Sequence, residues 1–206
     1  MWARAMAAVA ASSDSSLLFL VHSGCPVSTV AYGAGAEDYA TCSAWLQWAI
    51  NRMGAFNPTM VVVSTNANVL VSAMGAPVSE AATEAGLLNV LRELAGPNRK
   101  LVVIGDPPIL NQVGPDCLAA HSSDVQTCST PPDEAIHFPG DQAQIGAVAS
   151  AGGSYVDPVP WFCTTSVCPA VIGQFDVYEN RYHATSTYAA SLATVLQLAL
   201  GLQSAG

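Results

Sequence analysis

Short apolar runs alternate with amphipathic stretches along this chain. Four such runs are bounded by turn-forming residues: LLFLV (17–21), TMVVVS (59–64), KLVVIG (100–105) and SYVDP (154–158). Continuous apolar runs of this length are typical of strands buried on both faces of a parallel sheet. The pattern therefore predicts four parallel strands.

Helical spacing of apolar residues fills much of the chain between these runs. It predicts helices over residues 2–11, 42–53, 79–94, 141–153 and 187–202. Ser79 is the expected N-cap of the third helix, with Glu80 in its first turn. Residues 106–128 are expected to form a long loop, and residues 129–140 an irregular stretch. Alternating strands and helices predict an α/β fold with a parallel sheet, as one domain over residues 1–206.

Composition and charge narrow the function classes. The chain is 51% hydrophobic and only 10% charged, with a net charge of −9. A nucleic-acid partner would require a basic stripe, which this sequence lacks, and an anionic membrane surface is disfavoured by the same sign. No glycine-rich phosphate-binding motif follows a predicted strand, so no cofactor is expected.

The six cysteines are Cys25, Cys42, Cys117, Cys128, Cys163 and Cys168. Their spacing suggests three consecutive disulfides, 25 with 42, 117 with 128 and 163 with 168, which indicate an oxidising compartment outside the cytoplasm. A metal site built from Cys117, His121, Cys128 and His137 is the alternative. It is disfavoured because no C-x-x-C pair anchors it, so no metal is predicted. Residues 1–13 read as an amphipathic helix more than as an export signal.

The stretch from Asp157 to Tyr188 carries the candidate chemistry. It combines the closely spaced Cys163 and Cys168 with His183, in a polar loop just before the last predicted helix. This stretch resembles the end of the SGNH (GDSL-type) hydrolase domain that is fused to bacterial membrane acyltransferases. The matching positions are Trp161, Cys163, Cys168, Pro169, Gly173, Val177, Tyr178, His183 and Thr185.

The resemblance implies a fold and a set of site residues. The fold would be a three-layer α/β/α sandwich with a flavodoxin-like parallel sheet. His183 would be the general base, Gly24 and Asn66 the oxyanion donors, and Asn180 the partner that orients the histidine. Without the resemblance, Gly24 is equally well a turn glycine beside a disulfide, and Asn66 is more simply a turn former.

Two departures from the family pattern affect the functional interpretation. The family's nucleophilic serine lies in a G-D-S motif that closes the first strand, and this sequence contains no such motif; Gly105-Asp106 is followed by Pro107. Ser23 lies in a loop where the family has no nucleophile. The family's acidic residue before the histidine is Asn180 here, although Glu179 or Asp176 could substitute for it.

The first strand is therefore expected to be missing, with Met1 an internal methionine of a longer, membrane-tethered protein. The alternative is a true truncation that starts at Met1 and yields a pseudoenzyme. The function expected from the resemblance is an extracytoplasmic ester hydrolase or acyltransferase domain, acting on O-acyl groups of cell-envelope glycans. Its partners would be an acylated glycan or acyl donor and a membrane acyltransferase domain. The chain by itself is expected to be inactive. The alternative is a non-catalytic pseudoenzyme, or a glycan-binding or scaffolding module.

Overall fold

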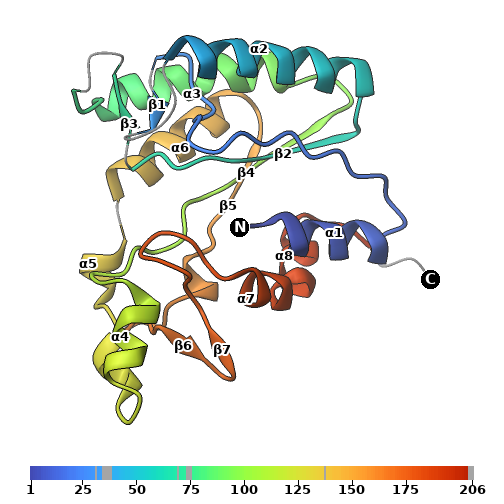
Figure 1. Cartoon of the computed structure of the whole chain (residues 1–206). Coiled ribbons are helices and arrows are strands. Elements are labelled where there is room, and N and C mark those ends of the chain that lie inside the picture. The colour runs from blue at the N-terminus through green and yellow to red at the C-terminus, as the bar shows by residue number, and fades with distance from the viewer. Residues whose placement is uncertain (31, 34–38, 69, 73–75, 137, 204–206) are drawn as a thin grey trace. The chain divides into compact units, whose positions relative to one another are not determined.

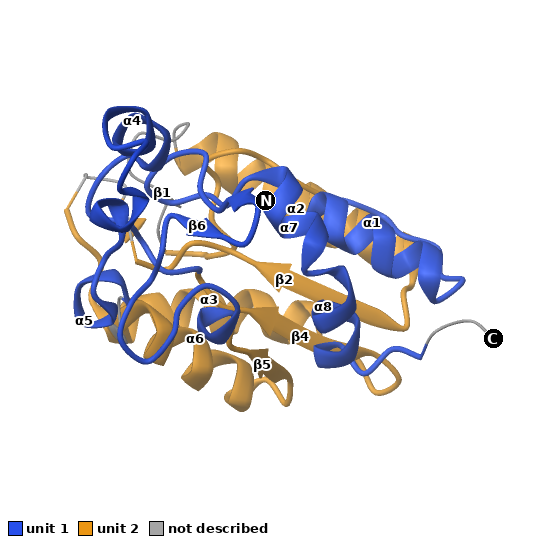
Figure 2. Cartoon of the chain, turned by 90° about the horizontal axis from the view of Figure 1, so that it is seen from below, with its two compact units in different colours: residues 1–19, 107–137, 158–206 blue, residues 20–106, 138–157 orange. Residues whose placement is uncertain are grey.

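The computed structural model describes residues 1–30, 32–33, 39–68, 70–72, 76–136 and 138–203. The chain forms two compact units, each assembled from separate stretches of sequence (Figure 1, Figure 2). Unit 1 consists of Met1–Phe19, Pro107–His137 and Pro158–Gly206, and unit 2 of Leu20–Asp106 and Phe138–Asp157. The single domain expected over residues 1–206 stays a prediction.

A parallel sheet of three strands lies within unit 2. The strands run in the order β2 (Met60–Ser64), β4 (Lys100–Ile104) and β5 (Ser154–Val156). Every side chain from Leu101 to Ile104 is buried. Because successive residues of a strand point to opposite faces, β4 must be covered on both faces, as its continuous apolar run predicts. Three of the four predicted strands are confirmed.

Three helices of unit 2 pack on one face of this sheet: α2 (Tyr39–Phe56), α3 (Glu80–Leu94) and α6 (Phe138–Ser150) (Figure 1). The core that they share with the sheet consists of Leu46, Met53, Val63, Leu87, Val90, Leu91, Leu94, Leu101, Val103, Ala147 and Val148. Helix α3 begins as predicted, since Ser79 Oγ accepts a hydrogen bond of 3.2 Å from Ala82 N. A short antiparallel pair, β1 (Tyr32–Gly33) and β3 (Leu70–Val71), completes the unit.

The run from Leu17 to Val21 is not a strand. This corrects the prediction of a buried strand over residues 17–21. Leu17, Phe19 and Val21 are 38%, 44% and 76% exposed. A buried strand requires a neighbouring strand to satisfy its backbone groups. Within the described residues no strand pairs with this run, and β2 pairs with β4 alone, so the other edge of β2 carries no strand.

Unit 1 brings the two ends of the chain together. Helix α1 (Ala3–Ser12) packs against α7 (Ser186–Ser191) and α8 (Ala193–Ala199). These last two helices replace the single helix predicted over 187–202. The break coincides with Ser191, whose Oγ donates a hydrogen bond of 2.7 Å to the Tyr188 carbonyl. Such side-chain bonds compete with the helical ladder and bend helices.

Short elements make up the rest of unit 1. They are α4 (Gly114–Ala120), η1 (Val125–Cys128), α5 (Pro132–Ala135), η2 (Val159–Trp161) and the antiparallel strands β6 (Val171–Ile172) and β7 (Phe175–Asp176). Helices α4 and α5 correct the expected loop over residues 106–128 and the irregular stretch that follows it. Both carry a proline at the start of the first turn, Pro115 in α4 and Pro132 in α5, where the missing N–H of proline has no helical partner to lose.

Three disulfides join consecutive cysteines in the predicted pairing. Cys25–Cys42 ties the loop before α2 to that helix in unit 2. Cys117–Cys128 and Cys163–Cys168 close short rings in unit 1. The disulfide between Cys117 and Cys128 rules out the alternative metal site, of which His137 lies outside the described residues.

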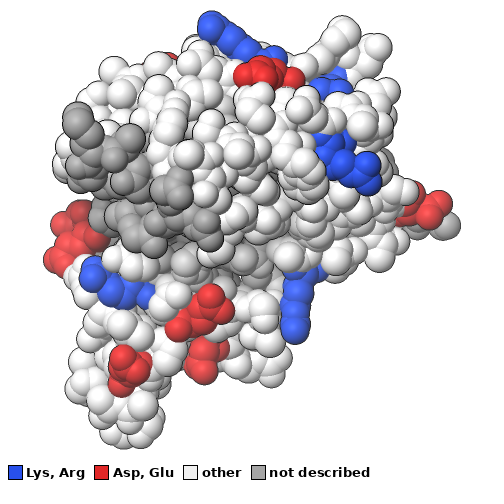
Figure 3. Space-filling model, turned by 45° about the horizontal axis from the view of Figure 1, so that its top comes forward, with Lys and Arg blue, Asp and Glu red and all other residues white. Residues whose placement is uncertain are grey.

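Charged side chains are sparse on the surface. The face drawn in Figure 3 is mostly uncharged, with acidic and basic side chains scattered over it. A membrane-spanning helix requires about 20 predominantly apolar residues. None of the helices in the described ranges combines the length and apolar character needed to cross a bilayer.

Candidate functional site

His183 lies in a tight loop of unit 1 that leads into α7. The loop is closed at its base by a β-bridge between Tyr178 and Ala184, and Glu179 N donates a hydrogen bond of 2.9 Å to the carbonyl of His183. Thr185 then caps α7, because its Oγ1 accepts from Tyr188 N at 3.2 Å and donates to the Asp176 carbonyl at 2.7 Å. His183 is therefore exposed on a loop whose two ends are both hydrogen-bonded.

Asn180 organises the turn within this loop. Its Oδ1 accepts hydrogen bonds from Tyr182 N at 2.7 Å and from His183 N at 2.9 Å. Its Nδ2 lies 3.0 Å from His183 Nδ1, and its Oδ1 lies 3.3 Å from the same ring nitrogen. Of the two acidic residues considered as substitutes, neither Glu179 nor Asp176 contacts the ring within the described chain. The structure thus brings Asn180 and His183 together.

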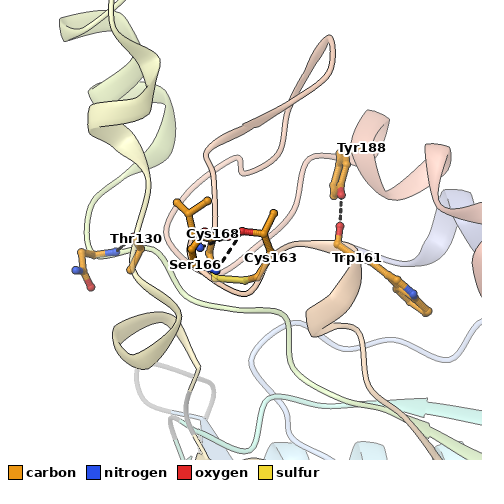
Figure 4. The surroundings of a disulfide bond; sticks show 9 residues. Thr130, Trp161, Cys163, Ser166, Cys168 and Tyr188 are labelled. Atoms are coloured by element: carbon orange, nitrogen blue, oxygen red, sulfur yellow. Dashed lines mark hydrogen bonds between the residues drawn. A yellow bond between two sulfur atoms is a disulfide. The ribbon is translucent and has the colours of Figure 1, made fainter.

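Aromatic residues pack at the base of the His183 loop. Phe162 packs against Tyr178 and Tyr188, with ring centroids 5.9 and 5.4 Å apart. Tyr188 Oη donates a hydrogen bond to the Trp161 carbonyl, next to the ring closed by Cys163 and Cys168 (Figure 4). Trp161 therefore contributes to the packing beneath the loop, and the small disulfide ring holds the adjoining chain.

The beginning of α1 also contacts the histidine loop. Met1 Sδ accepts a hydrogen bond of 3.4 Å from Ala184 N, the residue that follows His183. Trp2 packs edge-on against Trp161, with centroids 5.9 Å apart. The side chain of Met1 therefore contacts the loop that carries His183.

Gly24 lies in unit 2, in a turn that requires glycine. Cys25 N donates a hydrogen bond of 3.4 Å to the His22 carbonyl, and Gly24 has a φ of +77°. An L side chain rarely adopts that backbone conformation, whereas glycine adopts it freely. Two links fix the loop: the Cys25–Cys42 disulfide, and the bond of 3.0 Å from Val27 N to Thr65 Oγ1.

Asn66 follows β2 in the same unit. Its Oδ1 accepts a hydrogen bond of 2.9 Å from Asn68 N, the local turn for which asparagine is favoured. Its Nδ2 donates no hydrogen bond to any residue that the structure describes. The side chain is thereby oriented by its oxygen.

A buried polar cluster holds the chain just after Asn66. Asp106 Oδ2 accepts from Ala67 N at 2.8 Å, from Asn68 Nδ2 at 3.0 Å and from Gln144 Nε2 at 3.3 Å. Asn68 Oδ1 in turn accepts from Gly140 N at 3.1 Å. The cluster therefore fixes the backbone that positions Asn66.

Burial dominates the electrostatics of this cluster. The pKa of Asp106 is raised to about 7, mainly by desolvation and also by the charge of Asp141, against the lowering effect of the hydrogen bonds from Ala67 N, Asn68 and Gln144. Burial also raises the pKa of Asp141 to about 6. A carboxyl group with a raised pKa binds a proton more readily in the folded state than in the unfolded state.

Sequence reasoning did not identify this cluster. Asp106 was named only as part of Gly105-Asp106-Pro107, and no site role was predicted for Asn68. The available signal was positional: Asn68 follows β2 and Asp106 follows β4, and the carboxyl ends of neighbouring parallel strands meet at one edge of a sheet. Asn180 and His183 belong to unit 1, whereas Gly24 and Asn66 belong to unit 2.

The described part of the chain contains no group of three or more histidine, cysteine, aspartate or glutamate side chains able to hold a metal ion. The site chemistry that the described side chains offer is therefore that of amide donors, an imidazole and carboxyl groups. This set of groups suits hydrogen-bonding and proton-transfer chemistry.

The fold defines the class of protein. A similar solved structure is the lipopolysaccharide acetyltransferase periplasmic domain of Salmonella ser. Paratyphi A, with a TM-score of 0.67 and 13% sequence identity. The match covers 96% of this chain and 77% of that one. At this identity the likeness shows the fold alone, which is the SGNH hydrolase fold with its α/β architecture and parallel sheet.

The sequence defines the family more closely. The family model described as the SGNH domain fused to AT3 domains matches residues 1–197. The chain belongs to this family, and the resemblance noted around His183 is confirmed. No curated protein matches the chain in sequence.

Proposed function

We propose that this chain is the extracytoplasmic SGNH domain of a membrane acyltransferase that modifies cell-envelope glycans. The observation that carries the proposal is the Asn180–His183 pair, whose side chains meet at 3.0 Å in the position of the family's D-x-x-H. Membership of the family over residues 1–197 supports the same role. The neighbouring structure, a periplasmic acetyltransferase domain, is consistent with it.

In the proposed reaction a serine hydroxyl attacks the acyl carbonyl of an ester. His183 takes the hydroxyl proton and returns it to the departing alcohol, leaving the acyl group as a serine ester. Gly24 N and Asn66 Nδ2 stabilise the negative oxygen that develops on the carbonyl. Two features support these donors: the positive φ of Gly24, and the uncommitted amide of Asn66 within the described chain.

The nucleophile of this proposal lies outside the 206 residues, which contain no Gly-Asp-Ser. The contact of Met1 Sδ with Ala184 N, next to His183, is consistent with a nucleophile supplied from ahead of Met1. We propose that the 206-residue chain alone does not hydrolyse esters. The same preceding region would supply the link to the membrane acyltransferase domain.

The proposed location is outside the cytoplasm. The three disulfides are consistent with an oxidising compartment, since thiols in the cytosol are kept reduced. The proposed ligands are an acylated glycan or another acyl donor. No nucleic acid is proposed as a partner, because the net charge of −9 disfavours binding to phosphate chains.

The test compares two forms of the protein in an assay with a chromogenic acetyl ester. The natural protein, including any residues that precede Met1, is expected to hydrolyse the ester, and the 206-residue chain is not. His183→Ala is expected to lower the rate of the natural protein by at least about 10²-fold, the usual contribution of a general base. His121→Ala, at an exposed histidine of unit 1, is the matched control and is expected to leave the rate unchanged. Full activity of the His183→Ala variant would overturn the proposal.

A non-catalytic glycan-binding role is the second candidate. It is favoured by Asn180, which stands where the family pattern has an acid and hydrogen-bonds His183 without supplying a charge. Saturable binding of an acylated envelope glycan by the natural protein, with no release of acyl group over hours, would support this candidate. Turnover of the bound glycan would exclude it.

A further inference from the structure

We infer that Asn180 holds the neutral His183 ring in the tautomer that carries its proton on Nε2. In this tautomer Nε2 meets a ligand as a hydrogen-bond donor, and it can act as a base only after the ring proton has moved to Nδ1. The inference concerns the geometry of the loop alone. Its consequence for catalysis rests on the function proposed above.

The orientation of the Asn180 amide is fixed by the backbone. Its oxygen accepts from two N–H groups, those of Tyr182 at 2.7 Å and His183 at 2.9 Å. Exchanging the positions of the oxygen and nitrogen would point the amide hydrogens at both of these donors. Asn180 Oδ1 must therefore face the backbone, which leaves Nδ2 beside the imidazole ring.

The position of Asn180 Nδ2 determines which nitrogen of the neutral His183 ring carries the proton. It lies 3.0 Å from His183 Nδ1, closer than the 3.3 Å that separates Oδ1 from the same atom. An amide nitrogen only donates hydrogen bonds, so Nδ1 accepts and carries no hydrogen. In a neutral imidazole the proton then resides on Nε2.

Nothing else in the described surroundings reverses this preference. A carboxylate near Nδ1 would hold a proton there, but neither Glu179 nor Asp176 contacts the ring in the ranges that the structure describes. His183 Nε2 has no hydrogen-bond partner among the same residues. The side chain of His183 is exposed, so Nε2–H is open to solvent and to ligands.

The consequence for the proposed acyl transfer follows from proton balance. To take a serine proton on Nε2, the ring must first lose the proton already there and gain one on Nδ1. That change replaces the hydrogen bond of 3.0 Å from Asn180 Nδ2 with a longer one of 3.3 Å to Asn180 Oδ1, and it leaves the Nδ2 donor facing the Nδ1 donor. In a serine protease triad, replacing the orienting aspartate by asparagine leaves the geometry intact, fixes the wrong tautomer and lowers kcat by about 10⁴. Asn180 is thus a positioning residue that weakens His183 as a base.

The test is a ¹⁵N NMR measurement on the labelled 206-residue chain, in alkaline buffer where histidine rings are neutral. The matched variant is Asn180→Asp. Its carboxylate retains an oxygen for the N–H groups of Tyr182 and His183, while its other oxygen accepts a proton from Nδ1. A His183→Gln variant assigns the ring resonances by their loss.

The unsubstituted chain is expected to show an acceptor-type Nδ1 and a protonated Nε2, and Asn180→Asp is expected to reverse this pattern. A protonated Nδ1 in the unsubstituted chain overturns the inference, as does an unchanged pattern in Asn180→Asp. Retained dispersion of the backbone amide spectrum checks that the variant is folded.

A kinetic measurement on the natural protein separates this inference from the proposed function. If both hold, Asn180→Asp raises kcat by up to about 10⁴-fold with little change in KM, because the substitution acts on the base and not on substrate binding. If the tautomer reverses but neither protein hydrolyses the ester, the inference stands and the proposed function fails. If the ester is hydrolysed but the unsubstituted chain carries its His183 proton on Nδ1, the inference alone fails.

Discussion

At the residue scale, Asp106 shows how one buried side chain positions a candidate ligand-binding group. Its carboxyl group receives three hydrogen bonds, two from the loop after β2 and one from helix α6, all through Oδ2. Two buried acceptors nearby, Gln144 Oε1 and Asp141 Oδ1, have no partner among the described residues. A proton held by this cluster would supply a donor that these acceptors lack. The raised pKa values of Asp106 and Asp141 are consistent with that arrangement.

Stability is expected to depend on pH through Asp106. Burial raises its folded-state pKa from 3.8 to about 7. The folded state therefore favours the protonated group, so this contribution to stability is complete below pH 3.8 and is lost as pH rises through about 7. Since one pKa unit corresponds to about 1.4 kcal/mol, the loss is expected to be a few kcal/mol.

Asp106→Asn tests this prediction by removing the titration while keeping an acceptor oxygen. Urea unfolding at several pH values between about 4 and 8 is expected to show the variant gaining stability relative to the unsubstituted chain as pH rises. Asp14→Asn, at an exposed aspartate, is the control and is expected to show no such trend. A constant difference between Asp106→Asn and the unsubstituted chain over this range would contradict the prediction.

At the scale of elements, helix α6 approaches the Asn68 loop because position 140 has no side chain. A Cβ added to Gly140 would lie 2.1 Å from Asn68 Oδ1 and 3.0 Å from the Ala67 carbonyl carbon. Gly140→Ala must therefore displace Asn68 and its hydrogen bond to Asp106. We expect a loss of about 1–3 kcal/mol in the free energy of unfolding, the usual effect of overpacking.

Gly54, in the last turn of α2, offers the matched substitution. A Cβ there would meet nothing within 4 Å. Gly54→Ala is expected to stabilise the protein by about 0.5–1 kcal/mol, because alanine has the higher helix propensity. Opposite signs for the two variants in urea unfolding would support both predictions. A stabilising Gly140→Ala would show that the Asn68 loop moves at little cost.

The elements predicted from sequence succeeded where local pattern decides structure. The runs at 59–64 and 100–105 become β2 and β4 because continuous apolar residues suit a strand covered on both faces. LLFLV has the same pattern and fails, because a strand also needs a partner that a local pattern does not encode. Helix α4 was missed because its seven residues are too few to show a period, although Pro115 and Asp116 are helix-start signals.

Prediction of the site residues was also limited to what is local in the sequence. The spacing of Asn180 and His183 was readable in sequence, and three residues on a tight loop brought their side chains together. Which atom of Asn180 faces the ring depends on the backbone N–H groups of Tyr182 and His183, which only the folded loop reveals. The Asp106 cluster joins residues 67, 68, 106 and 144, and no local pattern connects positions so far apart.

At the scale of the whole molecule, the three disulfides link residues separated by 17, 11 and 5 positions. In the chain-entropy description, a disulfide stabilises by restricting the unfolded chain, and the effect grows with the loop that it closes. The longest loop, Cys25–Cys42, belongs to unit 2, and the two shorter ones belong to unit 1. Each unit thus has a covalent restraint of its own.

The lengths of the loops that the disulfides close predict which disulfide stabilises the folded protein more. Cys25–Cys42 and Cys163–Cys168 are matched in burial, since each pairs one buried cysteine with one half-buried cysteine. Replacing both cysteines by alanine is expected to lower the free energy of unfolding by about 3 kcal/mol for the first pair and about 2 kcal/mol for the second. Urea unfolding of the two variants in the same oxidising buffer measures the difference. A larger loss from the short ring would mean that Cys163–Cys168 acts mainly through folded-state packing beneath the His183 loop, and not by restricting the unfolded chain.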